Sequence, residues 1–172
     1  MKKIGVYGIG NVLIGDDAVG PTVVNLLDAL WEFPEGVVVE DLGTPSLDLA
    51  YRLTGLDAVI FVDAVSAKLE PGTIRVYRRD EILKNPPGLR LSPHDPSLKE
   101  TLLTCEFLGD CPKDVILVGI VPEAAGEFGL SASVQAAVPH AAAAVIEQLA
   151  SLGAIPQRRA AGGDVRPWWH AA

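Results

Sequence analysis

The sequence lacks any apolar run close to the about 20 residues that a membrane span requires, so we expect no transmembrane segment. Its opening, MKKIGVYGIG, also lacks an apolar stretch ending in a cleavage site, which makes a cytoplasmic location the default expectation. Positive charge is scarce: 14 Lys and Arg residues stand against 22 Asp and Glu residues, for a net charge of −8. This balance argues against nucleic acid and anionic membranes as partners.

Cysteine is nearly absent as well. The two thiols, Cys105 and Cys111, are separated by five residues. This spacing matches neither a redox C-x-x-C pair nor a zinc knuckle, so we expect one buried helical thiol and one loop thiol. The H-E-x-x-H and G-x-S-x-G motifs and a lysine-containing phosphate loop are missing too. A hydrolase with this sequence would therefore not use an obvious serine or cysteine nucleophile.

What the chain does contain is a regular alternation of apolar runs and helical patterns. Its 172 residues are 49% hydrophobic and 21% charged, which is typical of one globular domain. Strands are predicted over residues 4–9, 37–39, 58–62, 73–77 and 115–120, and helices over 16–31, 44–53 and 97–108. A last, alanine-rich helix is predicted to start at Ser131 or Ser133 and to run to Leu152. This order predicts the α/β class, as a three-layer α/β/α sandwich with a mainly parallel, twisted sheet of about five strands. We expect a single domain over residues 1–154 and a flexible tail over 155–172.

Polar residues at the starts of these helices are expected to cap them. Asp16 precedes the first helical pattern, and Thr44 followed by Pro45 has the form of an N-cap and first helical residue. Ser97, with Glu100 three residues later, predicts a capping box.

The stretch GIGNVLIGDDAVG joins the first predicted strand to the first helix. Its glycines and asparagine allow a sharp turn and a close approach of the backbone to a ligand. A dinucleotide site is a weak interpretation, because Leu13 stands where the third glycine would be. In addition, Asp16 and Asp17 would repel a pyrophosphate at the helix start. The same two carboxylates favour a cation.

Two further residues are expected at the same edge of the sheet. Asp63 follows the apolar run 58–62, and His94 lies in SPHDP, within a proline-rich stretch of irregular pattern. Taken singly, Asp17 reads as a first-turn acid, Asp63 as a turn cap and His94 as an ordinary loop histidine. Because ligands bind at the carboxyl ends of strands in open α/β sheets, the three together predict a site for a borderline divalent cation with open coordination positions.

The remaining candidates are weaker. Asp41 ends a predicted strand at the same edge, where it is expected to act as a cap or to support a ligand, and Glu123 is a candidate rim residue. His140 is expected on a helix surface. His170 stands in the tail beside the tryptophan pair 168–169, which is interpreted either as a docking patch or as a disordered end.

Five motifs in order, GIGNVLIGDDAVG, DLGT, VIFVDA, LSPHD and LVGIVPE, resemble the hydrogenase maturation endopeptidases over residues 3–152. The resemblance implies an α/β sandwich that removes the C-terminal extension of a [NiFe]-hydrogenase large-subunit precursor after nickel insertion. It therefore implies that precursor as the partner, and nickel as an ion that the substrate carries, although other divalent cations also fit such a site. The tail after Ile155 has no clear counterpart in the family pattern.

The resemblance also implies that Asp17, Asp63 and His94 are the metal-contacting and catalytic positions. The first of these is Glu in many relatives, and Asp is one methylene shorter, so the cation would lie closer to the helix start. Two alternatives from other classes stay open at this stage. One is a zinc-type amidase or peptidase with a resident metal, and the other is a non-catalytic hydrogenase assembly chaperone.

Overall fold

The computed structural model describes residues 1–46, 48–84, 88–89, 97–123, 128–160, 163 and 169. Its strands are β1 (Ile4–Ile9), β2 (Trp31–Glu32), β3 (Val37–Gly43), β4 (Ala58–Ser66), β5 (Ile74–Arg78), β6 (Gly88–Leu89), β7 (Asp114–Ile120) and β8 (Gln157–Arg158). Its helices are the 3-10 turn η1 (Gly15–Ala18), α1 (Val19–Leu30), α2 (Leu49–Leu53), α3 (Arg79–Lys84), α4 (Leu98–Phe107) and α5 (Ala132–Ser151).

Five strands form the central sheet in the order β3-β1-β4-β7-β5. The first four run parallel, and β5 pairs antiparallel with β7 at one edge. The short strand β6 adds to the end of β4 in the antiparallel direction. The predicted sheet of about five strands, mainly parallel and with residues 73–77 at an edge, is therefore confirmed.

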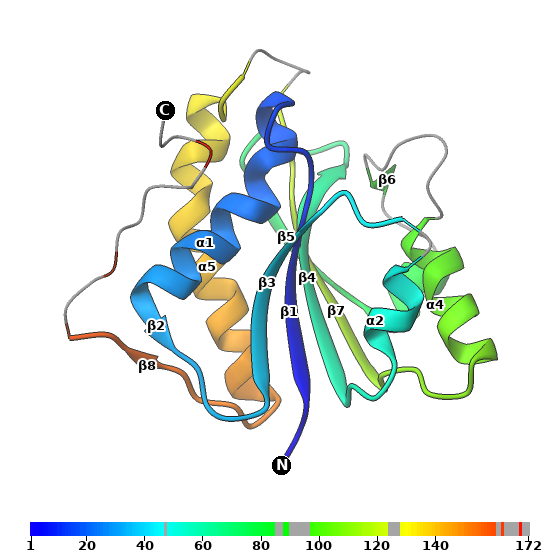
Figure 1. The fold of residues 1–172 in the computed structure, drawn as a ribbon. Helices are drawn as coiled ribbons and strands as arrows, with labels where there is room; N and C mark the ends of the chain where they lie inside the picture. Colours follow the sequence, from blue (N-terminus) through cyan, green and yellow to red (C-terminus); the bar gives the residue numbers. More distant parts are fainter. Residues whose placement is uncertain are drawn as a thin grey trace.

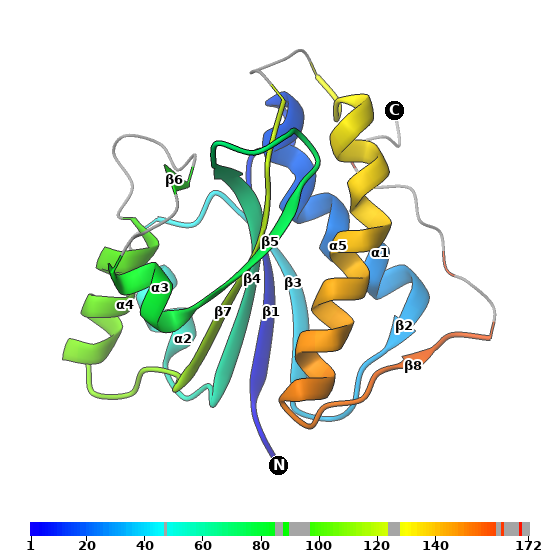
Figure 2. The same ribbon diagram turned by 180° about the vertical axis from the view of Figure 1, so that it is seen from behind.

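Helices cover both faces of the sheet, which confirms the three-layer sandwich. In Figures 1 and 2, α1 and α5 lie on one side of the sheet and α2, α3 and α4 on the other. The side chains of β4 alternate between the two cores: Ile60 and Val62 pack with α1 and α5, whereas Val59 and Phe61 pack with the opposite helices. None of the described helices is long and apolar enough to cross a membrane.

Two helix starts follow the predicted capping chemistry. The Ser97 hydroxyl accepts the Glu100 N–H at 3.2 Å, and the Glu100 carboxylate accepts the Ser97 N–H at 2.7 Å, which completes the capping box of α4. Ser131 is the N-cap of α5, and Pro139 lies inside that helix. In both cases the sequence signal is local, so it needs no knowledge of the rest of the fold.

Three local predictions are wrong. Asp16 does not cap the first helix: it lies in η1, and α1 begins at Val19 without a side-chain cap. The second helix does not begin at Thr44, because β3 continues through Gly43 and α2 starts only after its N-cap Asp48. The third strand does not stop before Asp63 but continues to Ser66, so Asp63 lies inside β4.

The chain after α5 returns to the body of the molecule. Residues 157–158, which the sequence assigns to a flexible tail, form β8 and pair antiparallel with β2. Arg159 continues this contact by donating its N–H to the carbonyl of Leu30, at the end of α1, at 2.9 Å. In Figure 1 this segment runs beside the lower end of α1.

Gly20, in the first turn of α1, lets the helix start lie directly on the ends of β1 and β4. A methyl group at this position would overlap the carbonyl oxygens of Ile9 and Val62, both of which are backbone atoms. We expect Gly20→Ala to lower the free energy of unfolding by about 3 kcal/mol, because neither carbonyl can move without disturbing the sheet. Gly153→Ala is the control: its positive φ of 86° meets open space, so the cost should stay near about 1 kcal/mol. Equal losses in urea unfolding would contradict the steric explanation.

Candidate active site

The site lies where the order of the sheet reverses. Strand β1 has β3 on one side and β4 on the other, so the crossovers that leave β1 and β3 run in opposite directions. At such a point the loops after the strands separate and leave a crevice at the carboxyl edge, which is where open α/β sheets bind ligands. The last β1–β4 pair is Gly8 with Val62, so Asp63 lies one residue beyond it, facing the loop that leaves β1.

That loop folds back on itself and fixes Asp17. Gly10 has a φ of 142°, and its backbone packs against the carbonyl of Asp17 so closely that no other residue would fit. The Asn11 N–H donates to Asp17 Oδ2 at 2.6 Å, and the Asp17 N–H donates to the Ile14 carbonyl at 2.9 Å. The Asp17 carboxylate is therefore held in place within η1.

Asp63 is the most unusual group at this edge, because it is charged at neutral pH in model peptides yet only 2% exposed here. Its Oδ1 accepts the N–H of Ala64 at 2.7 Å, while its Oδ2 is buried and accepts no hydrogen bond from the part of the chain that the structure describes. Burial raises the pKa of Asp63 well above its ordinary value, the nearby Asp17 carboxylate raises it further, and the Ala64 N–H acts in the opposite direction.

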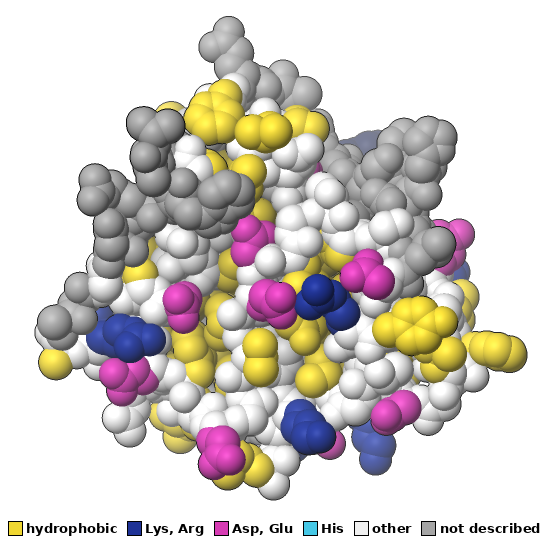
Figure 3. Space-filling view, viewed as in Figure 1, with side chains coloured by type: hydrophobic (Ala, Val, Ile, Leu, Met, Phe, Trp, Pro, Cys, Tyr) yellow, Lys and Arg dark blue, Asp and Glu magenta, His cyan; other side chains and the backbone are white. Residues whose placement is uncertain are grey.

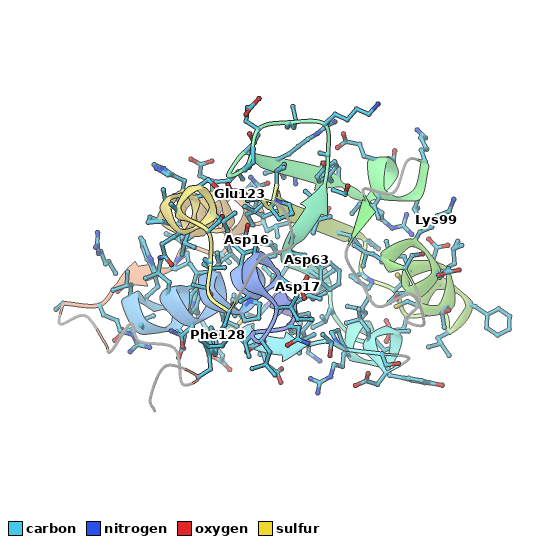
Figure 4. The ribbon with its side chains drawn as sticks, turned by 90° about the horizontal axis from the view of Figure 1, so that it is seen from above. Asp16, Asp17, Asp63, Lys99, Glu123 and Phe128 are labelled. Carbon is cyan, nitrogen blue, oxygen red and sulfur yellow. The ribbon has the colours of Figure 1, made fainter. Side chains whose placement is uncertain are left out.

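The pair Asp17 and Asp63 fits a cation. Figure 4, which looks onto the carboxyl edge from above, shows the two side chains next to each other. A buried carboxylate oxygen without a partner is costly, and a bound cation would satisfy Asp63 Oδ2 and remove the repulsion between the two carboxylates. The structure brings together two of the three predicted ligands, Asp17 and Asp63. Within the described ranges no third His, Cys, Asp or Glu residue joins them to form a group that could hold a metal.

The third predicted ligand, His94, lies outside the described residues. The described backbone on its N-terminal side ends at Leu89, which pairs in the sheet with Val65, two residues after Asp63. The chain is described again from Ser97, which caps α4. The last described residue before His94 therefore lies close to Asp63 in the sheet.

Asp16 has a role that the sequence did not indicate. Although only 7% exposed, its carboxylate accepts the Glu123 N–H at 2.8 Å, the Ser131 N–H at 2.6 Å and the Ser131 hydroxyl at 2.9 Å. These contacts join the loop after β1 to the loop after β7 and to the start of α5. Asp16 thereby fixes the backbone that presents Asp17. The doubled aspartate was the only signal in the sequence, and its partners lie more than 100 residues away, at separations of 107 and 115.

The weaker candidates occupy supporting or peripheral positions. Asp41 accepts the N–H of Gly43 at 2.8 Å at the end of β3, as its interpretation as a cap predicts. Burial raises the pKa of Asp41, while the bond from Gly43 acts in the opposite direction. Glu123 Oε2 accepts the hydroxyl of Ser133 at 2.9 Å, beside the Asp16 contacts. His140 is exposed on α5, as predicted, and His170 lies outside the described residues.

The cysteines have no part in this site. Cys105 is buried in α4 and Cys111 is half-buried in the following loop, which confirms the expected pair of a helical and a loop thiol. Burial raises the pKa of Cys105 to about 12, with a further contribution from Cys111. At neutral pH Cys105 is therefore a thiol rather than a nucleophilic thiolate.

Comparison with known proteins agrees with this architecture. The family model described as hydrogenase maturation protease matches residues 21–148. The hydrogenase 2 maturation protease of Escherichia coli strain K12 is 35% identical over 162 residues, covering 90% of this chain and 96% of that protein. The hydrogenase expression/formation protein HoxM of Azotobacter vinelandii is 33% identical over 156 residues, covering 90% of this chain and 75% of that protein.

Solved structures show the same likeness. The hydrogenase maturating endopeptidase HybD from E. coli superposes with a TM-score of 0.82 at 33% identity, covering 92% of this chain and 98% of that one. The hydrogenase 2 maturation peptidase from Thaumarchaeota archaeon SCGC_AB-539-E09 has a TM-score of 0.66 at 30% identity, covering 87% of this chain and 99% of that one. The chain belongs to the hydrogenase maturation protease family, and it is a maturation endopeptidase.

Removal of the Asp16 carboxylate should weaken the fold. Asp16→Ala leaves two backbone N–H groups and one hydroxyl without their acceptor, so we expect unfolding to become easier by about 2–4 kcal/mol. Asp28→Ala removes an exposed aspartate from α1 and should change stability by less than about 0.5 kcal/mol. The measurement is urea unfolding at pH 7. Loss of less than about 1 kcal/mol in Asp16→Ala would show that water replaces these contacts.

Asp63 should make the metal-free protein less stable as pH rises. Below the ordinary value of 3.8 the carboxyl is protonated in both the folded and unfolded states, so it causes no pH dependence of stability there. Above that value the unfolded chain ionises while the buried carboxyl retains its proton, so stability falls until pH reaches the raised pKa. Asp63→Asn should therefore raise the melting temperature at pH 7 by about 3 °C or more, corresponding to about 1 kcal/mol, and by much less near pH 4. A pH-independent difference would contradict a raised pKa.

Proposed function

We propose that this endopeptidase removes the C-terminal extension of a [NiFe]-hydrogenase large-subunit precursor, and that it recognises the nickel already inserted into that substrate. Asp17, Asp63 and His94 are the groups that contact the ion in this proposal. The observation that carries it is Asp63 Oδ2, a buried carboxylate oxygen without a described partner, next to a second carboxylate at the switch point of the sheet.

The donor set suits an ion that is brought by the substrate. Two carboxylates and an imidazole are acceptable ligands for nickel and other borderline cations, but they leave positions open for groups that the substrate provides. The raised pKa of Asp63 favours a proton on this carboxyl when no cation is bound. Arrival of a metal-bearing precursor would replace that proton with a cation, so recognition of the ion and ionisation of Asp63 would be coupled.

In this proposal the residues of this chain position the ion and the peptide segment next to it. One backbone N–H donates to the Asp17 carboxylate at 2.6 Å, and another donates to the Asp63 carboxylate at 2.7 Å. Asp16 connects the loop after β1 to the start of α5. An ion gripped by rigid ligands would bring the adjacent peptide segment to one place at the carboxyl edge. Such positioning converts an encounter between two molecules into a reaction within a complex.

The proposal is tested by comparing two forms of one substrate. We expect the protein to cleave the nickel-loaded large-subunit precursor from its own organism and to leave the nickel-free precursor intact, as measured by the intact mass of the precursor before and after incubation. Asp63→Asn and His94→Ala should each slow processing by roughly a hundredfold, since each removes a ligand. Equal cleavage of the loaded and nickel-free forms would reject recognition of the ion.

A carboxylate at the opposite end of the sheet provides the matched control. Asp114 begins β7 and is exposed, so Asp114→Asn removes the same charge far from the carboxyl edge and should leave processing unchanged. The same preparations test the alternative of a resident-metal enzyme. A stoichiometric, tightly bound metal in the purified protein, with cleavage of nickel-free substrate, would favour that alternative.

A further inference from the structure

An apolar pocket adjoins the candidate site on the α1–α5 side of the sheet. It has a volume of 430 Å³, within the range of sites that hold small ligands or single side chains. It opens between the start of α1 and the N-terminal half of α5, beside the loop that leaves β1. Its apolar lining comes from Val12, Ala18, Leu26, Leu130, Val138 and Trp169.

The pocket is continuous with the edge that carries Asp17. Ala18 is the next residue after Asp17, and Val12 follows Asn11, whose N–H donates to the Asp17 carboxylate. Beside it the surface is also apolar, with Leu13, Ile14 and Phe128 at exposed fractions of 69%, 50% and 57%. Figure 3 shows apolar side chains gathered at the upper end of the molecule, and Figure 4 shows Phe128 on the same side of the site as Asp17.

The C-terminal segment supplies one wall of this pocket, and it is tied to the end of α1. Arg159 donates its N–H to the Leu30 carbonyl at 2.9 Å and its Nε–H to the Asp28 carbonyl at 3.3 Å. Gly163 donates its N–H to the Ala29 carbonyl at 2.8 Å. These three carbonyls have no partners within the helix, so the segment satisfies groups that would otherwise need water.

We propose that this pocket binds an apolar side chain of the client polypeptide close to the bond that is cut, with Trp169 as one of its walls. The inference rests on the proposed function, because it takes the client to be a polypeptide positioned by the ion at Asp17 and Asp63. It assigns to the segment after α5 a part in substrate selection.

The side chains that line the pocket favour an apolar side chain as its occupant. Its described polar side chains, Thr22 and Gln135, are uncharged, so the described lining offers no cation to pair with a phosphate or a carboxylate. An apolar side chain gains burial there, and the amide of Gln135 stands at the surface where a peptide group would pass. An extended chain that places one residue in the pocket and another at Asp17 needs only a few residues, because each spans about 3.3 Å.

Filling the pocket from its rim tests the proposal. Gln135→Trp places an indole at the mouth, whereas Ala136→Trp places the same side chain on the next residue of α5, which is exposed but does not line the pocket. The measurement is the dissociation constant of the nickel-free large-subunit precursor by calorimetry. We expect Gln135→Trp and Trp169→Ala to raise this constant at least threefold and Ala136→Trp to leave it unchanged.

The result separates this inference from the proposed function. A smaller rise in Gln135→Trp, an equal rise in Ala136→Trp, or no binding by the unmodified enzyme would overturn the pocket assignment. Thermal melting of each variant shows whether it is folded, and Trp169→Ala tests the pocket without adding bulk. If the nickel-free precursor is cut during the titration, recognition of nickel fails, and KM then replaces the dissociation constant in the same comparison.

The client provides the second half of the test. Replacing the apolar residues beside its cleavage site with serine should raise the dissociation constant for the unmodified enzyme at least threefold. The same replacement should not raise the dissociation constant for the Gln135→Trp variant any further. Such non-additivity is the signature of two changes at one contact. Additive losses would place the apolar contact elsewhere and overturn the assignment.

Discussion

Burial of the Asp63 carboxyl beside the carboxylate of Asp17 is the constraint around which the carboxyl edge is organised. Asp63 is only 2% exposed, and its Oδ2 accepts no hydrogen bond from the described part of the chain. Holding two such groups together costs free energy that only a proton or a cation can remove. Gly10 and Gly20 permit this arrangement, because each lets two stretches of backbone approach more closely than a side chain would allow.

Long-range hydrogen bonds also join different segments at the same edge. A single carboxylate, Asp16, joins the segment after β1 to the segments that precede and begin α5, through three short hydrogen bonds. Because each of these partners is a backbone N–H or a cap hydroxyl, the contact restrains main chain rather than side chains. Rigidity of this kind is needed at a site that must hold like charges in a fixed geometry.

Where sequence signals are local, they predicted the fold well. The alternation of apolar runs gave the strands and their parallel order, and the Ser97–Glu100 pair gave the start of α4, because these depend on residues a few positions apart. The prediction for Asp16 failed for the opposite reason. The N-cap preference of Asp16 lost to hydrogen-bond donors more than 100 residues away, at separations of 107 and 115, which no local pattern contains.

The candidate site was predictable only in part, and for a related reason. The order of strands places Asp17 and Asp63 at one edge, but burial of Asp63 Oδ2 depends on β4 extending beyond it to Ser66. The sequence left the tryptophan pair 168–169 open between a docking patch and a disordered end, because the position of Trp169 depends on the C-terminal segment reaching the last carbonyls of α1.

A client that offered both an ion and an apolar side chain would contact two features of different physical origin. The ion interacts with charge and is screened by salt, whereas the apolar contact is not. When both belong to one polypeptide, the second contact forms within the complex, and their free energies combine. A chain that lacks either feature would then bind weakly, which is how two modest contacts select one substrate among many.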